Sequence, residues 1–123
     1  MNNNLEIRIA ASTQEVEANS EAALRTMEEL KEEMAELERL MNKNGSKENT
    51  NALNTAIIKF NELTDSQIRE SKEAWQKYEA LKQEGKAQAV VLPQLKELHK
   101  ACERAERLAT DLTCYSSGNP KPQ

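Results

Sequence analysis

The chain has 123 residues, of which 31% are charged and only 3% are aromatic, and its formal net charge is −4. With three glycines and three prolines it offers few positions for sharp turns, so a compact globule around a large aromatic core is disfavoured. A composition rich in Glu, Lys, Ala and Leu predicts an all-α protein of long helices or coiled coil. The charge is uneven: residues 1–41 carry −6, residues 42–84 are neutral and residues 85–123 carry +2.

Residues 1–11 form an N-terminal arm whose structure the sequence leaves open. Leu5, Ile7 and Ile9 alternate with polar residues, which is typical of a strand or an extended arm. Ile9 also begins a series of apolar residues spaced seven apart, which favours helix. Because Ser12-Thr13-Gln14-Glu15 has the spacing of a capping box, we place the first secure helix at about residues 12–41.

This first helix carries two positions that repeat every seven residues, the spacing of a coiled-coil seam. One position holds Thr13, Ser20, Met27, Met34 and Met41, and the other holds Ile9, Val16, Ala23, Leu30 and Leu37. A helix this long with so thin an apolar stripe needs a packing partner to be stable. The strongest stretch is therefore our candidate partner-binding surface: Met27, Leu30, Met34, Leu37 and Met41. Packing inside the chain is the alternative, and we expect this stretch to pack first against residues 53–68.

The clearest break in the chain is the polar segment NKNGSKENTN at residues 42–51. A second helix at about residues 51–84 follows, and its apolar spacing slips near Thr64, so a kink there stays open. Antiparallel pairing with the first helix would set Trp75 and Tyr78 against small residues near Val16 and Ala23.

Gly85 ends or interrupts the second helix, and Pro93 suits the first turn of a third helix at about residues 93–115. The predicted seam of this helix is Leu95, Leu98, Cys102, Ala105, Ala109 and Leu112. The sequence thus predicts one helical domain, residues 12–115, followed by a flexible tail, residues 116–123. Short connections favour a three-helix antiparallel bundle. A long helical hairpin with a shorter third helix, completed by another chain, is the alternative, and both have coiled-coil-like packing.

The sequence contains few residues suited to catalysis or metal binding. His99, Cys102 and Glu103 share one helical turn and could begin a metal site, but a fourth ligand is missing and Cys102 already fits the apolar seam. The single histidine suits no catalytic triad, and no phosphate-binding glycine loop is present. We therefore expect no enzyme activity, no metal and no cofactor, and a half-exposed surface position for His99.

A basic row follows the third helix: Lys96, Lys100, Arg104 and Arg107. Such a row is the feature that phosphate binding requires, which makes a nucleic-acid-associated regulator one alternative function. Glu97, Glu103 and Glu106 interrupt the row, and the chain is acidic overall. Pairing with the acidic first segment explains the row as well, so we expect no nucleic-acid partner.

The function that these patterns favour is protein–protein interaction: an adaptor or chaperone-like module that binds a partner helix or self-associates as a homo-oligomer. A structural coiled-coil oligomer or spacer is another alternative. We expect a cytoplasmic protein, because the two cysteines suit a reduced compartment and neither a signal peptide nor an apolar stretch of membrane-spanning length is present. In size, acidity and hairpin character the chain resembles small helical chaperones and adaptors of bacterial secretion systems or phages. That likeness covers the whole chain, rests on composition alone and implies no site residue.

Overall fold

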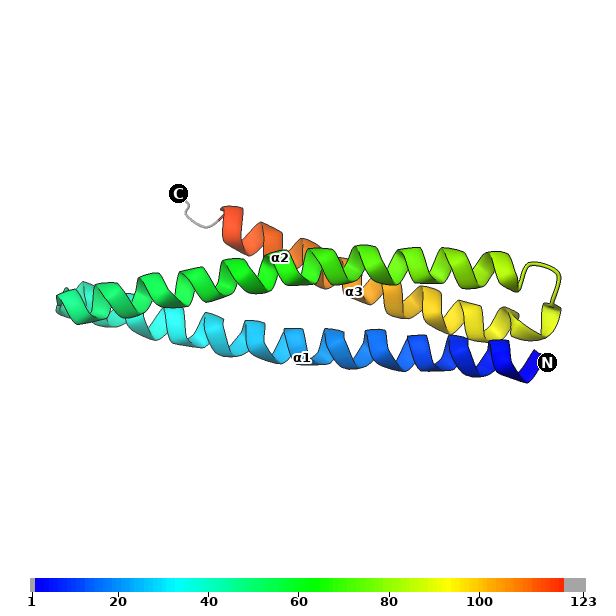
Figure 1. Ribbon diagram of the computed structural model, residues 1–123. Coiled ribbons are helices and arrows are strands. Elements are labelled where there is room, and N and C mark those ends of the chain that lie inside the picture. Colours follow the sequence, from blue (N-terminus) through cyan, green and yellow to red (C-terminus); the bar gives the residue numbers. More distant parts are fainter. Residues whose placement is uncertain (1, 119–123) are drawn as a thin grey trace.

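The computed structural model describes residues 2–118, which form three α-helices and one short 3₁₀ helix. These are α1 (Asn2–Lys43), α2 (Lys47–Glu84), η1 (Ala89–Val91) and α3 (Leu92–Gly118). Figure 1 shows α1 and α2 as a long antiparallel hairpin, with the shorter α3 lying against both and running in the direction of α1. The predicted all-α three-helix antiparallel bundle is confirmed.

The segment that the sequence left open is the beginning of α1, because Leu5 and Ile9 are both buried in the bundle. They lie four residues apart on one helical face, together with Leu81 and Val91. Ile7 lies between them in sequence and is 65% exposed. In a strand all three residues would share one face, so the exposure of Ile7 agrees with helical periodicity. The predicted cap at Ser12 therefore lies inside a continuous helix.

α2 begins at Lys47, a few residues before the predicted start, because Ser46 caps it. The Ser46 hydroxyl accepts a hydrogen bond from the backbone N–H of Asn49 at 3.1 Å. The helix then continues through Thr64, where the sequence left a kink open. Thr64 is buried, and its hydroxyl donates to the carbonyl oxygen of Phe60 at 2.9 Å, so this polar side chain is satisfied within the helix.

The core consists of two apolar clusters along the bundle. The first includes Ile9, Leu81, Val91 and Leu98, and the second includes Met27, Met34, Phe60 and Leu112. All six residues of the predicted third-helix seam are buried. Residues 116–118 of the predicted tail belong to α3, and the rest of that tail, 119–123, lies outside the described residues.

Candidate functional site

The candidate partner-binding stripe of α1 is divided between two environments. Met27, Leu30 and Met34 are buried in the second core cluster, which also contains Ala56 and Phe60 of α2. The predicted packing against residues 53–68 is thus confirmed, and α3 joins it through Leu108 and Leu112. Leu37 and Met41, nearer the end of α1, are only half-buried.

The methionine position of the heptad lies on the side of α1 that faces α3. Ser20 shares this position, and it lines a groove together with Arg104 and Leu108 of α3. Seven residues make almost two helical turns, so Met41 points to nearly the same side as Ser20. At Met41, however, the described part of α3 no longer covers that side.

The level at which α3 ends can be located from one contact. The Lys31 ammonium lies 4.8 Å from the ring centroid of Tyr115, three residues before the end of α3. From Lys31, α1 continues to Lys43, and α2 returns alongside it from Lys47. Figure 1 shows this part of the hairpin projecting beyond the described end of α3. Near the end of this projecting part the described chain supplies two helices where the rest of the bundle has three (Figure 1), although Leu37 and Leu53 still pack against the core cluster that contains Leu112 of α3.

We call the apolar surface of this projecting part the tip face; it consists of Leu37, Met41, Leu53 and Ile57. The first three are half-buried, and Ile57 is 42% exposed. Ile57 shares a heptad position with Ser71 and Tyr78. Ser71 lines a groove with α3, and the ring of Tyr78 lies 5.3 Å from that of His99, so this position of α2 also faces the path of α3.

The sequence pointed to Leu37 and Met41 but missed Leu53 and Ile57 as members of the same surface. The missing information was the length of α3 relative to the hairpin: α3 has 27 residues, whereas α1 has 42 and α2 has 38. A sequence signal did exist, because Ile57 is a large apolar residue at the heptad position that it shares with Ser71 and Tyr78.

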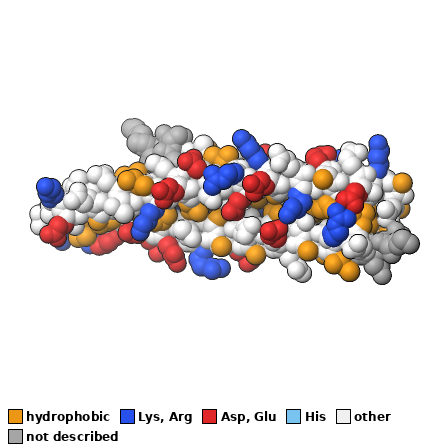
Figure 2. Space-filling model, in the orientation of Figure 1, with side chains coloured by type: hydrophobic (Ala, Val, Ile, Leu, Met, Phe, Trp, Pro, Cys, Tyr) orange, Lys and Arg blue, Asp and Glu red, His pale blue; other side chains and the backbone are white. Residues whose placement is uncertain are grey.

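Charges along the hairpin change sign near its end. Residues 28–38 contain six glutamates and one lysine, whereas residues 39–47 contain three bases and no acid. Glu38 lies near the end of α3: burial, and secondarily the Glu38 carboxylate, raise the pKa of Tyr115. In the space-filling view, charged side chains of both signs are spread over the visible face, with apolar atoms between them (Figure 2). Arg39 of the second stretch is ion-paired with Glu36 of the first at 2.6 Å, and Glu48 directly follows Lys47, so acids and bases alternate around the end of the hairpin.

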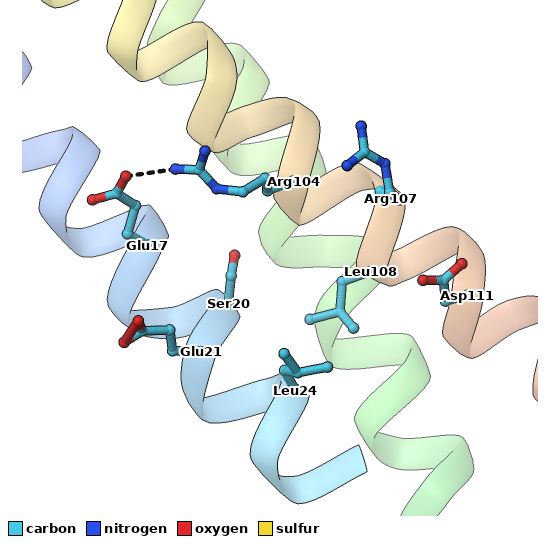
Figure 3. A pocket seen from close by; sticks show the side chains of 8 residues that line it. All are labelled: Glu17, Ser20, Glu21, Leu24, Arg104, Arg107, Leu108 and Asp111. Atoms are coloured by element: carbon cyan, nitrogen blue, oxygen red, sulfur yellow. Dashed lines mark hydrogen bonds and ion pairs between the residues drawn. The ribbon is translucent and has the colours of Figure 1, made fainter. Parts of the chain in front are cut away.

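A separate groove of about 520 Å³ lies between α1 and α3 (Figure 3). The Arg104 guanidinium donates to the Glu17 carboxylate across it at 2.5 Å. Leu24 and Leu108 approach each other at its other end, and the Ser20 hydroxyl lies between the two helices without a hydrogen-bond partner among the described residues. The ion pair lies at one end of this groove and joins α1 to α3 there (Figure 3).

The basic row of α3 is exposed, but its members have different surroundings. Arg104 pairs with Glu17 of the acidic α1, as the pairing interpretation predicted. Lys100 lies 3.7 Å from Glu97 on its own helix. Lys96 and Arg107 lie about three turns apart on α3 and border two different grooves. The structure thus does not combine the four cations into one uninterrupted cationic surface.

His99 occupies the half-exposed position that the sequence predicted, and it packs against aromatic rings. Its ring lies edge-on to those of Trp75 and Tyr78, with centroids 5.1 and 5.3 Å away. Of the small residues expected opposite these aromatics, Val16 shares their cluster, whereas Ala23 belongs to the other one. Cys102 is fully buried, and burial raises the pKa of its thiol to about 11.

Among residues 2–118, no three His, Cys, Asp or Glu side chains are arranged to hold a metal ion. Within the same residues, none of the helices has the length and apolarity to cross a membrane. Compared with known proteins, the chain matches no protein-family model, no curated protein and no solved structure.

Proposed function

We propose that the protein is a non-enzymatic helical interaction module and that the tip face is its binding surface. The observation that supports this proposal is that the α1–α2 seam continues as an apolar surface beyond the described end of α3. A helix with an apolar stripe, laid along the line of α3, would supply the missing third wall of the bundle.

The expected affinity is modest. Full burial of a Leu, Ile or Met side chain is worth about 1.5–3 kcal/mol, and the four residues of the tip face are already partly covered. Completing their burial would stabilise the complex by on the order of 4 kcal/mol, before the entropic cost of association is subtracted. Because the remaining affinity is small, additional polar contacts have to provide specificity. Such an exchangeable contact suits an adaptor or chaperone-like role better than a permanent assembly.

The chemistry of the face also suits a helical partner. Its four side chains are aliphatic or thioether groups, which recognise an apolar stripe by shape rather than by hydrogen bonds. Met41 in particular has a flexible, polarisable side chain that adapts to different partners. A partner is therefore expected to present Leu, Ile or Met at helical spacing.

Two neighbouring isoleucines allow a matched test of this proposal. Ile57 belongs to the tip face, whereas Ile58 is 57% exposed and points about 100° away around the helix. A photo-crosslinking amino acid placed at position 57 in the native host should give a defined adduct, and the same group at position 58 should not. Adding Met41→Glu should remove the adduct at position 57. Equal adducts at both positions, or none at position 57, would contradict the proposal.

A further inference from the structure

We infer that the last part of α3, residues 107–118, is a strap that opens from the bundle as a unit while the rest of α3 stays docked. The break lies where a layer of polar groups crosses the core. The inference goes beyond the proposed function, because it concerns a motion of the isolated chain that needs no partner. For the tip face the consequence is that an open strap uncovers more of the same α1–α2 seam.

The polar layer centres on the three polar side chains that are buried in the described part of the chain: Thr64, Gln67 and Ser71. Their spacing of three and four residues places them on one face of α2. Gln67 is only 2% exposed, and its side-chain amide donates to the Ala105 carbonyl oxygen of α3 at 3.2 Å. On α1, the Ser20 hydroxyl is buried without a described hydrogen-bond partner. All three helices therefore place a polar group in this layer.

The layer separates the two apolar clusters of the core. On each helix the buried apolar residues change from one cluster to the other across it: Val16 to Ala23 on α1, Phe60 to Ala74 on α2, and Ala105 to Leu108 on α3. The core is thus two apolar units divided by polar groups. Local opening of a protein follows such cooperative units rather than single residues, which makes this layer a natural boundary between them.

Before the layer, α3 docks firmly. Its buried residues there all belong to the first cluster: Leu95, Leu98, Ala101, Cys102 and Ala105. Two polar contacts lie next to the layer. The Trp75 indole N–H donates to the Glu106 carboxylate at 3.0 Å, and Arg104 pairs with Glu17 of α1. Opening this part of α3 would expose much of the first cluster and break contacts to both other helices.

Beyond the layer, the strap docks through fewer apolar side chains. Leu108 and Leu112 are buried in the second cluster, and the half-buried Tyr115 ring lies with its centroid 4.8 Å from that of Phe60. Ala109 is also buried, but its side chain is a single methyl group. Ordering each residue of the strap costs conformational entropy, which these few side chains have to offset. The strap is therefore the part of α3 with the weakest docking.

Opening of the strap uncovers the inner continuation of the tip face. Met27 and Met34 are buried in the same cluster as Leu108 and Leu112. Without the strap they lie along one α1–α2 seam that leads to Met41 at the tip. A helix bound at the tip face then meets a longer apolar stripe, so the strap sets the length of the groove that a partner can use.

Native-state hydrogen exchange of the purified full chain, resolved by NMR, tests the inference without any substitution. The relevant amides are those of residues 111–116, whose helical acceptors lie within the strap. They should exchange at least ~100-fold faster than the amides of residues 98–105, and all with one opening constant. Amides of residues 27–34 should stay at least about tenfold better protected than the strap. Low urea should leave strap exchange unchanged, because the opening exposes little surface.

Ordinary fraying of a helix end gives a different result. Its protection falls steadily from residue to residue toward Gly118, with no shared opening constant. Such a gradient would overturn the inference. Equal protection along the whole of α3 would overturn it as well, because the strap would then open only when the bundle unfolds.

A matched pair of substitutions tests whether the polar layer sets the break. Gln67→Leu places an apolar side chain at the centre of the layer and joins the two clusters, so strap exchange should slow at least about tenfold. Gln76→Leu is the control, because Gln76 is exposed on the same helix, and its strap should exchange as in the parent. Circular dichroism verifies that both variants keep the helix content. Strap exchange that Gln67→Leu leaves unchanged would overturn the assignment of the break to this layer.

Discussion

Arg8 and Glu84, 76 positions apart in the chain, form a fork-to-fork ion pair across the open end of the hairpin. Arg8 Nη1 donates to Glu84 Oε1 at 2.9 Å, and Nη2 donates to Oε2 at 2.7 Å. The pair joins the start of α1 to the last turn of α2. Together with the burial of Leu5 and Ile9, it fixes the N-terminal segment as helix against α2.

This ion pair predicts a pH-dependent stability. The hydrogen bond from Arg8 lowers the pKa of Glu84 below its ordinary value of 4.5. The unfolded chain therefore binds the proton more readily, so the contribution of the pair is present above pH 4.5 and is lost as the pH falls through the lowered pKa. Glu84→Gln should slightly lower the thermal unfolding midpoint at pH 7, and the difference from the parent should close in acid.

The matched control for this prediction is Glu79→Gln, an exposed glutamate on the same helix. Its midpoint should follow that of the parent across the whole pH range. Added salt should also reduce the difference caused by Glu84→Gln, because both partners are about half exposed. A difference that persists unchanged at the lowest pH would mean that the ion pair is not its cause.

Heptad spacing was sufficient to predict the helical class, the order of the three helices and the buried seam of α3. It was sufficient because the apolar residues of that seam recur at intervals that only a helix brings to one side: Leu95, Leu98, Cys102 and Leu112. The beginning of α1 stayed open because Leu5, Ile7 and Ile9 satisfy a two-residue alternation as well. Only long-range burial against Leu81 and Val91 decides between the two patterns, and a local pattern does not contain that information.

The candidate surface was predicted less well than the fold. Periodicity shows that Met27, Met34 and Met41 share one side of a helix, but not which of them another helix covers. That depends on where the end of α3 lies relative to the hairpin, which is a property of the assembled bundle. The structure places Met27 and Met34 in the core and leaves Met41 at the tip.

The connection between α2 and α3 predicts a steric requirement at Gly85. Its backbone angles, φ −91° and ψ 6°, are accessible to other residues, so the constraint is space and not conformation. A Cβ at this position would lie 2.7 Å from Cγ2 of Val91, a stiff and fully buried side chain. Gly85→Ala should therefore lower the free energy of unfolding by about 1–3 kcal/mol, measured by urea denaturation.

A double-mutant cycle checks that explanation. Val91→Ala removes the clashing methyl group, so adding Gly85→Ala to that variant should cost at least about 1 kcal/mol less than in the parent. Gly45→Ala is the control, because a Cβ there meets only the Met41 carbonyl oxygen at an ordinary 3.5 Å. Additive effects of Gly85→Ala and Val91→Ala would show that the contact with Val91 is not limiting.

The two cysteines should differ sharply in reactivity. Cys114 is exposed, whereas Cys102 is buried, with a pKa raised by burial from 9.0 to about 11. At pH 8 the Cys102 thiol is therefore both protonated and shielded. Ellman's reagent should modify one thiol per chain rapidly and the second only as the protein unfolds. Cys114→Ser should remove the rapid phase, and two rapid thiols in the parent would place Cys102 at the surface.

Methionine oxidation should reveal the division of the α1 stripe directly. Dilute hydrogen peroxide reaches thioether sulfur in proportion to its exposure, so Met41 should form sulfoxide several-fold faster than the buried Met27 and Met34. Peptide mapping by mass spectrometry follows the three sites separately. In 6 M urea the three rates should converge, since unfolding removes the difference in burial. Equal rates at all three methionines in the folded protein would contradict the separation of the stripe into core and tip.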